Sequence, residues 1–343
     1  MKKTKIKPIL SLIFFVLLNS VTYGQIESIF IPKMTAVNPT SYTDVIFSSM
    51  KDTVLVSTYS GRISEYTQHT KKERIISQIN DEIYVLAYNP LQKHIAASTL
   101  ESGIIIINKN TGKIINKVSL LETWALRMDY SKDYKYLFAN DQRGNRFVWN
   151  VSSNYKSVQL PDSMPKGSII SITDDVFTII TSNNLIKWDL KHEKIIEQKT
   201  IKVTKLGDID REDNILSINF NTCELYAAKN NKSVFTLQHP SWLRPVESIG
   251  GEDAARTAGL KISNGYFEDT NYQMAITYAR FSKNKIFTSS IDRSIRIWDK
   301  LTGQLVTSLT GHQATINKMK VSKSGTQLVS VDLKGGIKFW DID

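Results

Sequence analysis

The chain is short of the residues that build cross-links and metal sites. Among its 343 residues, Cys223 is the only cysteine, and the five histidines lie at 69, 94, 192, 239 and 312. A single cysteine excludes an internal disulfide and a cysteine-based zinc site, and the histidines lack metal-ligand spacing. Gly-x-Ser-x-Gly elbows, phosphate loops and dinucleotide fingerprints are also missing. We therefore expect no catalytic residue, no metal site and no cofactor, and a fold that depends on its apolar core.

Long apolar runs are equally scarce. The run "ILSLIFFVLL" (9–18) follows four lysines and precedes small residues that end at Gly24. It is too short and too sharply ended for a spanning helix, and nothing later is long enough to cross a membrane. We predict a secretory signal at 1–24, cleaved before Gln25, with an uncleaved anchor as the alternative. The mature protein is then expected to be periplasmic or secreted, without lipid attachment at its N-terminus because Cys223 lies far from the signal.

The charge balance argues against a nucleic-acid partner. Without residues 1–24, 40 Lys and Arg remain against 33 Asp and Glu. Blocks of basic residues interleaved with aromatic ones, the usual footprint of nucleic-acid binding, do not occur. The remaining excess of positive charge gives only a weak preference for acidic partners.

What the sequence does contain is an internal repeat. Seven copies of a strand-like run are "GRISEYTQ" (61–68), "GIIIINKNTG" (103–112), "GNRFVWNVS" (144–152), "NNLIKWDLK" (183–191), "KSVFTLQ" (232–238), "RSIRIWDKLTG" (293–303) and "GGIKFWDID" (335–343). Most spacings are close to the ~40–45 residues of a four-stranded propeller blade. Met319 and Val321 alternate with Lys318 and Lys320, which indicates a strand with one buried face. The sequence therefore predicts an all-β fold.

The last two copies carry a specific resemblance. In residues 290–343, Gly311-His312 precedes Trp340-Asp341 at the spacing of the WD-repeat family, which this chain resembles. The resemblance implies a seven-bladed β-propeller of four-stranded antiparallel blades over 25–343. Trp340-Asp341 would end the third strand of the last blade. We expect residues 26–34 to supply its fourth strand and close the ring, because an open ring leaves two unpaired sheet edges.

The family often joins a His, a Ser or Thr, an Asp and the Trp by hydrogen bonds. The resemblance assigns structural roles to Asp292 and Trp298 in blade 6 and to His312 and Trp340 in blade 7. Blade 6 lacks a preceding Gly-His, and Lys334 stands in blade 7 where Asp292 stands in blade 6. We therefore predict that neither blade carries the full set.

Two regions are candidates for partner binding. An insertion at about 239–271 carries Trp242, Arg244, Tyr266 and Phe267, and it is either a contact surface or a self-packed excursion. The resemblance also implies a narrow top face, on which alignment places Tyr59, Glu101, Arg143, Asn183, Lys229, Arg293 and Lys334. Trp124 is expected nearby, either as a contact residue or as filler between blades.

We expect a non-catalytic scaffold that docks a protein or peptide. An acidic partner and a cell-envelope complex are the forms considered. The alternative is a propeller enzyme, a hydrolase or a quinone-dehydrogenase-like protein, with its site at the mouth of the central channel. "DKLTGQLV" (299–306) and "NKNTGKII" (108–115) also resemble a motif of the quinone-dehydrogenase-like propellers. The enzyme needs converging acidic or His residues on inner strands, which the sequence does not reveal. "DIDREDN" (208–214) departs from a calcium loop, and we predict a hairpin turn there.

Overall fold

The computed structural model describes residues 25–30, 41–50, 52–70, 72–120, 123–227, 232–239 and 241–342. At 25–30, 241–242 and 270–273 it describes the strand but not the side chains. The predicted signal at 1–24, residues 31–34 of the predicted closing segment, and Lys229 lie outside the described residues. Across the described ranges, no helix combines the length and the apolar character needed to cross a membrane.

The described residues form seven antiparallel sheets of four strands and one sheet of three. The first sheet contains β2 (Tyr42–Phe47), β3 (Thr53–Thr58), β4 (Arg62–Thr67) and β5 (Lys72–Gln78). The second contains β6 (Ile83–Asn89), β7 (His94–Thr99), β8 (Ile104–Asn108) and β9 (Ile114–Val118). The third contains β10 (Ala125–Tyr130), β11 (Tyr136–Asp141), β12 (Arg146–Asn150) and β13 (Lys156–Ser157). The next two are β14 (Ser168–Thr173), β15 (Val176–Ile180), β16 (Asn184–Asp189) and β17 (Lys194–Thr200); β18 (Lys205–Ile209), β19 (Ile215–Asn219), β20 (Thr222–Ala227) and β21 (Lys232–Gln238). The last two are β25 (Ile276–Ser282), β26 (Lys285–Ser290), β27 (Ile295–Asp299) and β28 (Leu305–Leu309); β29 (Ile316–Val321), β30 (Gln327–Asp332) and β31 (Gly336–Asp341), with β1 (Gln25–Phe30).

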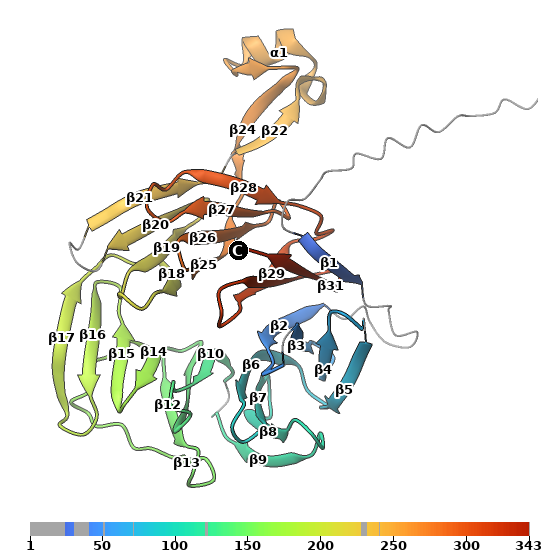
Figure 1. The fold of residues 1–343 in the computed structure, drawn as a ribbon. Coiled ribbons are helices and arrows are strands. Elements are labelled where there is room, and N and C mark those ends of the chain that lie inside the picture. The colour runs from blue at the N-terminus through green and yellow to red at the C-terminus, as the bar shows by residue number, and fades with distance from the viewer. Residues whose placement is uncertain are drawn as a thin grey trace, which may run out of the picture.

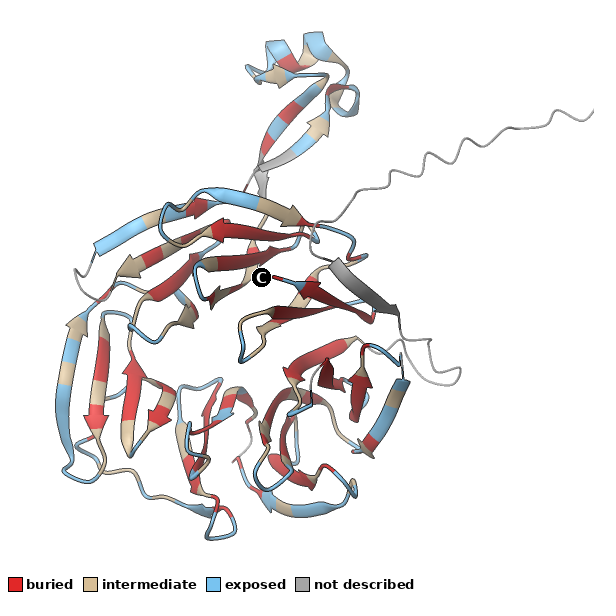
Figure 2. Ribbon diagram, in the orientation of Figure 1, coloured by how far each residue is buried: buried red, intermediate tan, exposed pale blue. Residues whose placement is uncertain are grey.

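These sheets stand radially around a common centre, with the first strand of each sheet innermost (Figure 1). Apolar clusters join neighbouring sheets, and one cluster packs Val45 and Val54 of the first sheet against Val329 and Phe339 of the seventh. Buried residues concentrate in the middle strands, while the outermost strands are largely exposed (Figure 2). The all-β prediction is therefore confirmed, and the arrangement is consistent with a β-propeller.

The N-terminal strand pairs with the C-terminal one, as the sequence predicted. β1 runs antiparallel to β31, with Gln25 opposite Trp340 and Phe30 opposite Gly336. The last sheet thereby gains its fourth strand from the opposite end of the described chain. The free edge of β31 is covered by backbone pairing.

The fifth copy of the repeat belongs to a different strand from the one that its alignment predicted. "KSVFTLQ" forms β21, the fourth strand of its sheet, and not the third. The third strand is β20, in which Tyr226 occupies the place that Trp188 and Trp298 hold in their own sheets. All three residues follow a register irregularity against the fourth strand. Because Lys229 lies outside the described residues, its predicted top-face position stays a prediction.

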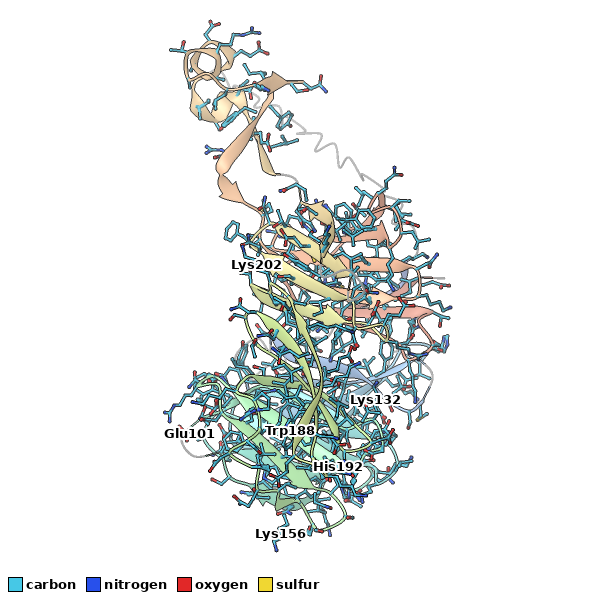
Figure 3. The ribbon with its side chains drawn as sticks, turned by 90° about the vertical axis from the view of Figure 1, so that its left-hand side faces the viewer. Glu101, Lys132, Lys156, Trp188, His192 and Lys202 are labelled. Atoms are coloured by element: carbon cyan, nitrogen blue, oxygen red, sulfur yellow. The ribbon has the colours of Figure 1, made fainter. Side chains whose placement is uncertain are left out.

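The insertion folds on itself. It contains β22 (Ser241–Pro245), the 3-10 helix η1 (Val246–Ile249), α1 (Glu252–Thr257), β23 (Ile262–Ser263) and β24 (Tyr266–Gln273). Val246, Ala255 and Phe267 form a small apolar core of their own. The unit stands away from the sheets in both ribbon views (Figures 1 and 3). Phe267 is 4% exposed, so its ring packs inside the insertion and offers little surface to a partner.

Candidate functional site

The connections of each sheet divide between two faces of the ring. In an antiparallel sheet, successive turns alternate between its ends. We call top face the side that carries the turns between second and third strands and the connections between sheets. Figure 3 separates the two sides: Glu101 and Lys202 lie opposite Lys132 and His192. The insertion connects β21 to β25, so it leaves the ring on the top face.

Most predicted top-face residues lie where the resemblance implied. Tyr59, Glu101, Arg143, Asn183, Arg293 and Lys334 all lie in turns between second and third strands, and all are exposed. They are spread over six sheets and do not form one continuous cluster with the insertion.

Three aromatic residues do come together on this face, and we call them the aromatic cluster. The ring of Trp124 stacks on Tyr84, with centroids 5.6 Å apart, and Tyr59 meets the ring of Tyr84 edge-on, with centroids 5.8 Å apart. Tyr59 is 42% exposed, and the other two are partly buried. Trp124 is therefore neither fully exposed, as a contact residue would be, nor fully buried, as filler between blades would be. The sequence missed Tyr84, which sits at the register irregularity in β6, where a bulge can redirect a side chain.

Carboxylates surround the aromatic cluster. The Tyr84 hydroxyl donates to Glu82 Oε2 at 2.8 Å, and burial together with this bond raises the pKa of Tyr84 to about 12. Asp81 accepts from the backbone N–H groups of Glu101 and Ser102 at 3.1 and 2.7 Å. Burial would raise the pKa of Asp81, but these donors outweigh it and lower the pKa. The cluster is therefore an aromatic surface with a negatively charged border.

The insertion offers a smaller exposed surface. Arg244 forms an ion pair with Asp269 at 2.9 Å, and its guanidinium lies 5.8 Å from the centre of the Phe267 ring. The pair braces β22 against β24. Tyr266 is 47% exposed and remains available for contact. The side chain of Trp242 lies outside the description, so its predicted role stays a prediction.

The seventh sheet carries a complete hydrogen-bonded set, contrary to the sequence prediction. His312 Nδ1 lies 2.8 Å from Asp332 Oδ2, and its Nε2 lies 2.7 Å from Ser330 Oγ. Trp340 Nε1 donates to the same Ser330 hydroxyl at 2.8 Å. The prediction failed because it expected the Asp six residues before the Trp, where the exposed Lys334 lies. The Asp of the set is Asp332, at the end of β30.

The sixth sheet also has its histidine, His239, which comes before the insertion in the chain. His239 Nε2 lies 2.6 Å from Thr288 Oγ1, which accepts from Trp298 Nε1 at 2.8 Å. Arg296 donates to His239 Nδ1 at 2.9 Å and pairs with Asp292 at 2.7 Å. A histidine therefore serves this sheet, although Gln238 rather than a glycine precedes it. The insertion hid it by lengthening the distance along the chain to Trp298.

Burial sets the protonation of both histidines. His239 is fully buried, and burial together with the neighbouring Arg296 lowers its pKa to about 3. Burial also lowers the pKa of His312, although Asp332 opposes the shift. Both imidazole groups bind residues of nearby strands in the interior of the protein, away from solvent. Their geometry supports the structural roles predicted for His312, Trp340, Asp292 and Trp298.

A cavity of about 1960 Å³ opens where the inner strands meet. Acidic residues do converge there, although the sequence did not reveal them. Asp44 accepts from the backbone of Leu86 on the next sheet, and Asp208 accepts from the backbone of Phe281, each at 2.9 Å. These carboxylates join neighbouring inner strands. Within the described ranges, no group of three or more His, Cys, Asp and Glu is placed to hold a metal.

The acidic run at 208–214 is a turn. It lies at the hairpin between β18 and β19, as predicted. Asp210 accepts from the backbone of Glu212 and Asn214 at 2.9 Å and pairs with Lys300 at 2.7 Å. Its carboxylate therefore serves the turn and the neighbouring sheet.

Comparison with known proteins supports the WD-repeat reading of the C-terminal part. Residues 303–341 match the family described as WD domain, G-beta repeat. The chain is 20% identical over 262 residues to the U3 small nucleolar RNA-associated protein 15 homolog of Gallus gallus, covering 74% of this chain and 44% of that protein.

Two further relatives match shorter segments. Identity is 39% over 59 residues with transcription initiation factor TFIID subunit 5 of Caenorhabditis elegans, covering 17% of this chain and 9% of that protein. It is 28% over 94 residues with the guanine nucleotide-binding protein subunit beta of Schizosaccharomyces pombe, covering 26% and 31%. The chain thus spans less than half the length of each relative. Together with the all-β fold, the matches support a likeness to WD-repeat proteins.

Proposed function

We propose that this chain is a seven-bladed WD-repeat propeller that serves as a non-catalytic scaffold and docks a protein or peptide on its top face. The observation that carries the proposal is the aromatic cluster of Tyr59, Tyr84 and Trp124. Large aromatic side chains that are stacked in place, yet partly accessible, are typical anchors of protein interfaces. The insertion, with Tyr266 exposed, leaves the ring on the same face and extends the surface.

The charge around the aromatic cluster defines the partner's chemistry. The carboxylates of Asp81 and Glu82 border the cluster, so a segment that presents Lys or Arg beside an apolar side chain fits it best. An acidic partner was expected from the sequence, and Arg143 and Arg293 remain exposed elsewhere on the face. The basic partner is the better-supported proposal, because its charge complements the acidic residues next to the aromatic cluster.

Export is a second part of the proposal. It is supported by the lysines, the apolar run and the small residues at 1–24. The scaffold would then act in the periplasm or outside the cell, within an envelope complex. Periplasmic recovery of a mature form starting at Gln25 would support this, and full retention of residues 1–24 in the purified protein would contradict it.

Affinity purification from native envelopes, followed by mass spectrometry and titration of the isolated partner, tests the docking site. We expect Tyr59→Ala and Trp124→Ala each to weaken binding roughly tenfold or more, as truncation of an interface anchor does. The matched control is Leu91→Ala, which removes a 72% exposed apolar side chain from the turn between β6 and β7, on the side opposite the top face.

Two outcomes separate the alternatives. Unchanged affinity for both aromatic variants excludes the aromatic cluster as the site. Loss of binding only on charge reversal of Arg143 and Arg293 would favour the acidic partner. The fold of each variant is checked by its circular dichroism spectrum and melting temperature.

A further inference from the structure

Five basic side chains line one part of the central cavity. They are Arg127 of β10, Lys205 of β18, Arg280 of β25, and Lys318 and Lys320 of β29. They come from four different sheets, and we call them the channel cations. Inner strands of this kind are pressed together by the ring, so charges on them cannot move apart. This gathering of like charge needs a physical explanation.

The channel cations lie within electrostatic reach of one another. Burial, Lys318 and Arg280 lower the pKa of Lys205, and burial and Arg280 lower those of Lys320 and Arg127. Arg280 is therefore the shared neighbour of the set. Its guanidinium and the Lys318 ammonium also lie 5.3 and 5.4 Å from the centre of the Tyr278 ring. Burial acts to lower the pKa of Lys318, but Asp44 and Tyr278 outweigh it, so this lysine stays charged.

Carboxylates act on the channel cations only from a distance: Asp44 raises the pKa of Lys318, and Asp129 acts to raise those of Lys320 and Arg127. Among the described residues, none of the five forms an ion pair. The acidic residues of the same strands accept backbone hydrogen bonds: Asp44 from Val45 and Leu86, Asp208 from Phe281, and Asp129 from Tyr130. The polar contacts of Lys205, Arg127 and Arg280 are with backbone carbonyl groups, and Lys320 has no described hydrogen bond. The carboxylates of these strands are thus engaged by backbone N–H groups, which leaves side-chain donors of the channel cations for an anionic ligand.

We propose that the central cavity binds a small multivalent anion that carries phosphate groups, held by the channel cations beside Tyr278. A multivalent anion fits better than chloride because one molecule can contact cations from several sheets at once. Phosphate oxygens suit both the guanidinium groups and the lysine ammonium groups. The volume of about 1960 Å³ exceeds a typical small-molecule pocket, so an inorganic polyphosphate and an organic bisphosphate both have room.

The test measures melting temperature and isothermal titration calorimetry with sodium tripolyphosphate and, separately, a sugar bisphosphate. We expect 1 mM of the better ligand to raise the melting temperature by about 3 °C or more at low salt. Potassium chloride at equal ionic strength should raise it by less than about 1 °C. The ligand that raises the melting temperature more indicates whether the bound anion is inorganic or organic.

Variants locate the site. Lys318→Gln combined with Lys320→Gln should weaken binding at least tenfold, and Lys205→Gln, on another sheet, should weaken it independently. Lys113→Gln is the matched control, because it removes an exposed lysine in the turn before β9. Absence of binding by the wild-type protein, or equal binding by variants and control, overturns the proposal. Neither result bears on the top-face partner, whose binding is measured separately.

Discussion

At the scale of single residues, two buried histidines in the connections between sheets are fixed by different partners. His312 contacts a carboxylate, Asp332, whereas His239 contacts a guanidinium, Arg296. A nearby anion tolerates a protonated ring, and a nearby cation opposes it. The two histidines should therefore respond differently to acid, although both occupy the same place relative to a Trp.

Acid should destabilise the fold through His239. The unfolded chain takes up a proton near pH 6.5, but the folded chain does so only near pH 3. The contribution to stability is complete above pH 6.5 and is lost as the pH falls toward 3. Between pH 7 and 4, we expect the wild-type free energy of unfolding to fall by on the order of 3 kcal/mol more than that of His239→Asn. Urea unfolding measures it, with His192→Asn as the exposed control.

Ser330 should matter more than its size suggests. Its hydroxyl serves both His312 Nε2 and Trp340 Nε1 inside the seventh sheet. Ser330→Ala leaves two buried polar atoms without a partner, which costs about 1–3 kcal/mol for each such atom. Urea unfolding should show this loss, while Ser324→Ala on the exposed turn stays within about 0.5 kcal/mol. Equal stability of the two variants would contradict the role of the network.

At the scale of elements, the outer strands combine exposure with irregular pairing. In the described chain, β1, β5, β9, β17, β21 and β28 all show a register irregularity against their third strand. An irregular, twisted strand is a poor template for a second molecule. Aliphatic side chains such as Ile196 and Val306 can therefore lie exposed on these edges without inviting sheet extension.

Removing the N-terminal strand should expose a regular edge. Deletion of residues 25–34 leaves β31 unpaired on one side, and β31 is almost completely buried in the intact sheet. We expect a lower melting temperature and concentration-dependent association, measured by calorimetry and light scattering. Addition of a peptide covering 25–34 should restore monomers in part. A melting curve identical to that of the intact protein would show that β1 does not close the ring.

At the scale of the whole molecule, the insertion and the ring are separate packing units. The insertion has its own core, and Ser241 lies opposite Gln273 where its two long strands begin and end. Replacing 241–273 by Gly-Gly should therefore change the melting temperature of the ring by less than about 2 °C. A fall of more than about 5 °C, or loss of the buried state of His239, would show that the ring depends on the insertion.

How far the site follows from the sequence depends on how local its parts are. The positions of Tyr59 and Glu101 followed from repeat spacing, because a turn is a short-range feature. Tyr84 joins Tyr59 and Trp124 only through the contact between adjacent sheets, so no spacing reveals it. Asp332 and His239 escaped for a related reason, since the chain offset between partners differs from one sheet to the next.

The sequence by itself determined the all-β class, the repeating strands and the pairing of the chain's early segment with its last strand. Alternating apolar residues and regular spacing carry that information along the chain. The tertiary structure alone decided which side chains share a space: the aromatic cluster, the buried histidine networks and the channel cations. Those groups bring together residues from different sheets, and the packing of sheets around one centre, rather than any local pattern, sets their distances.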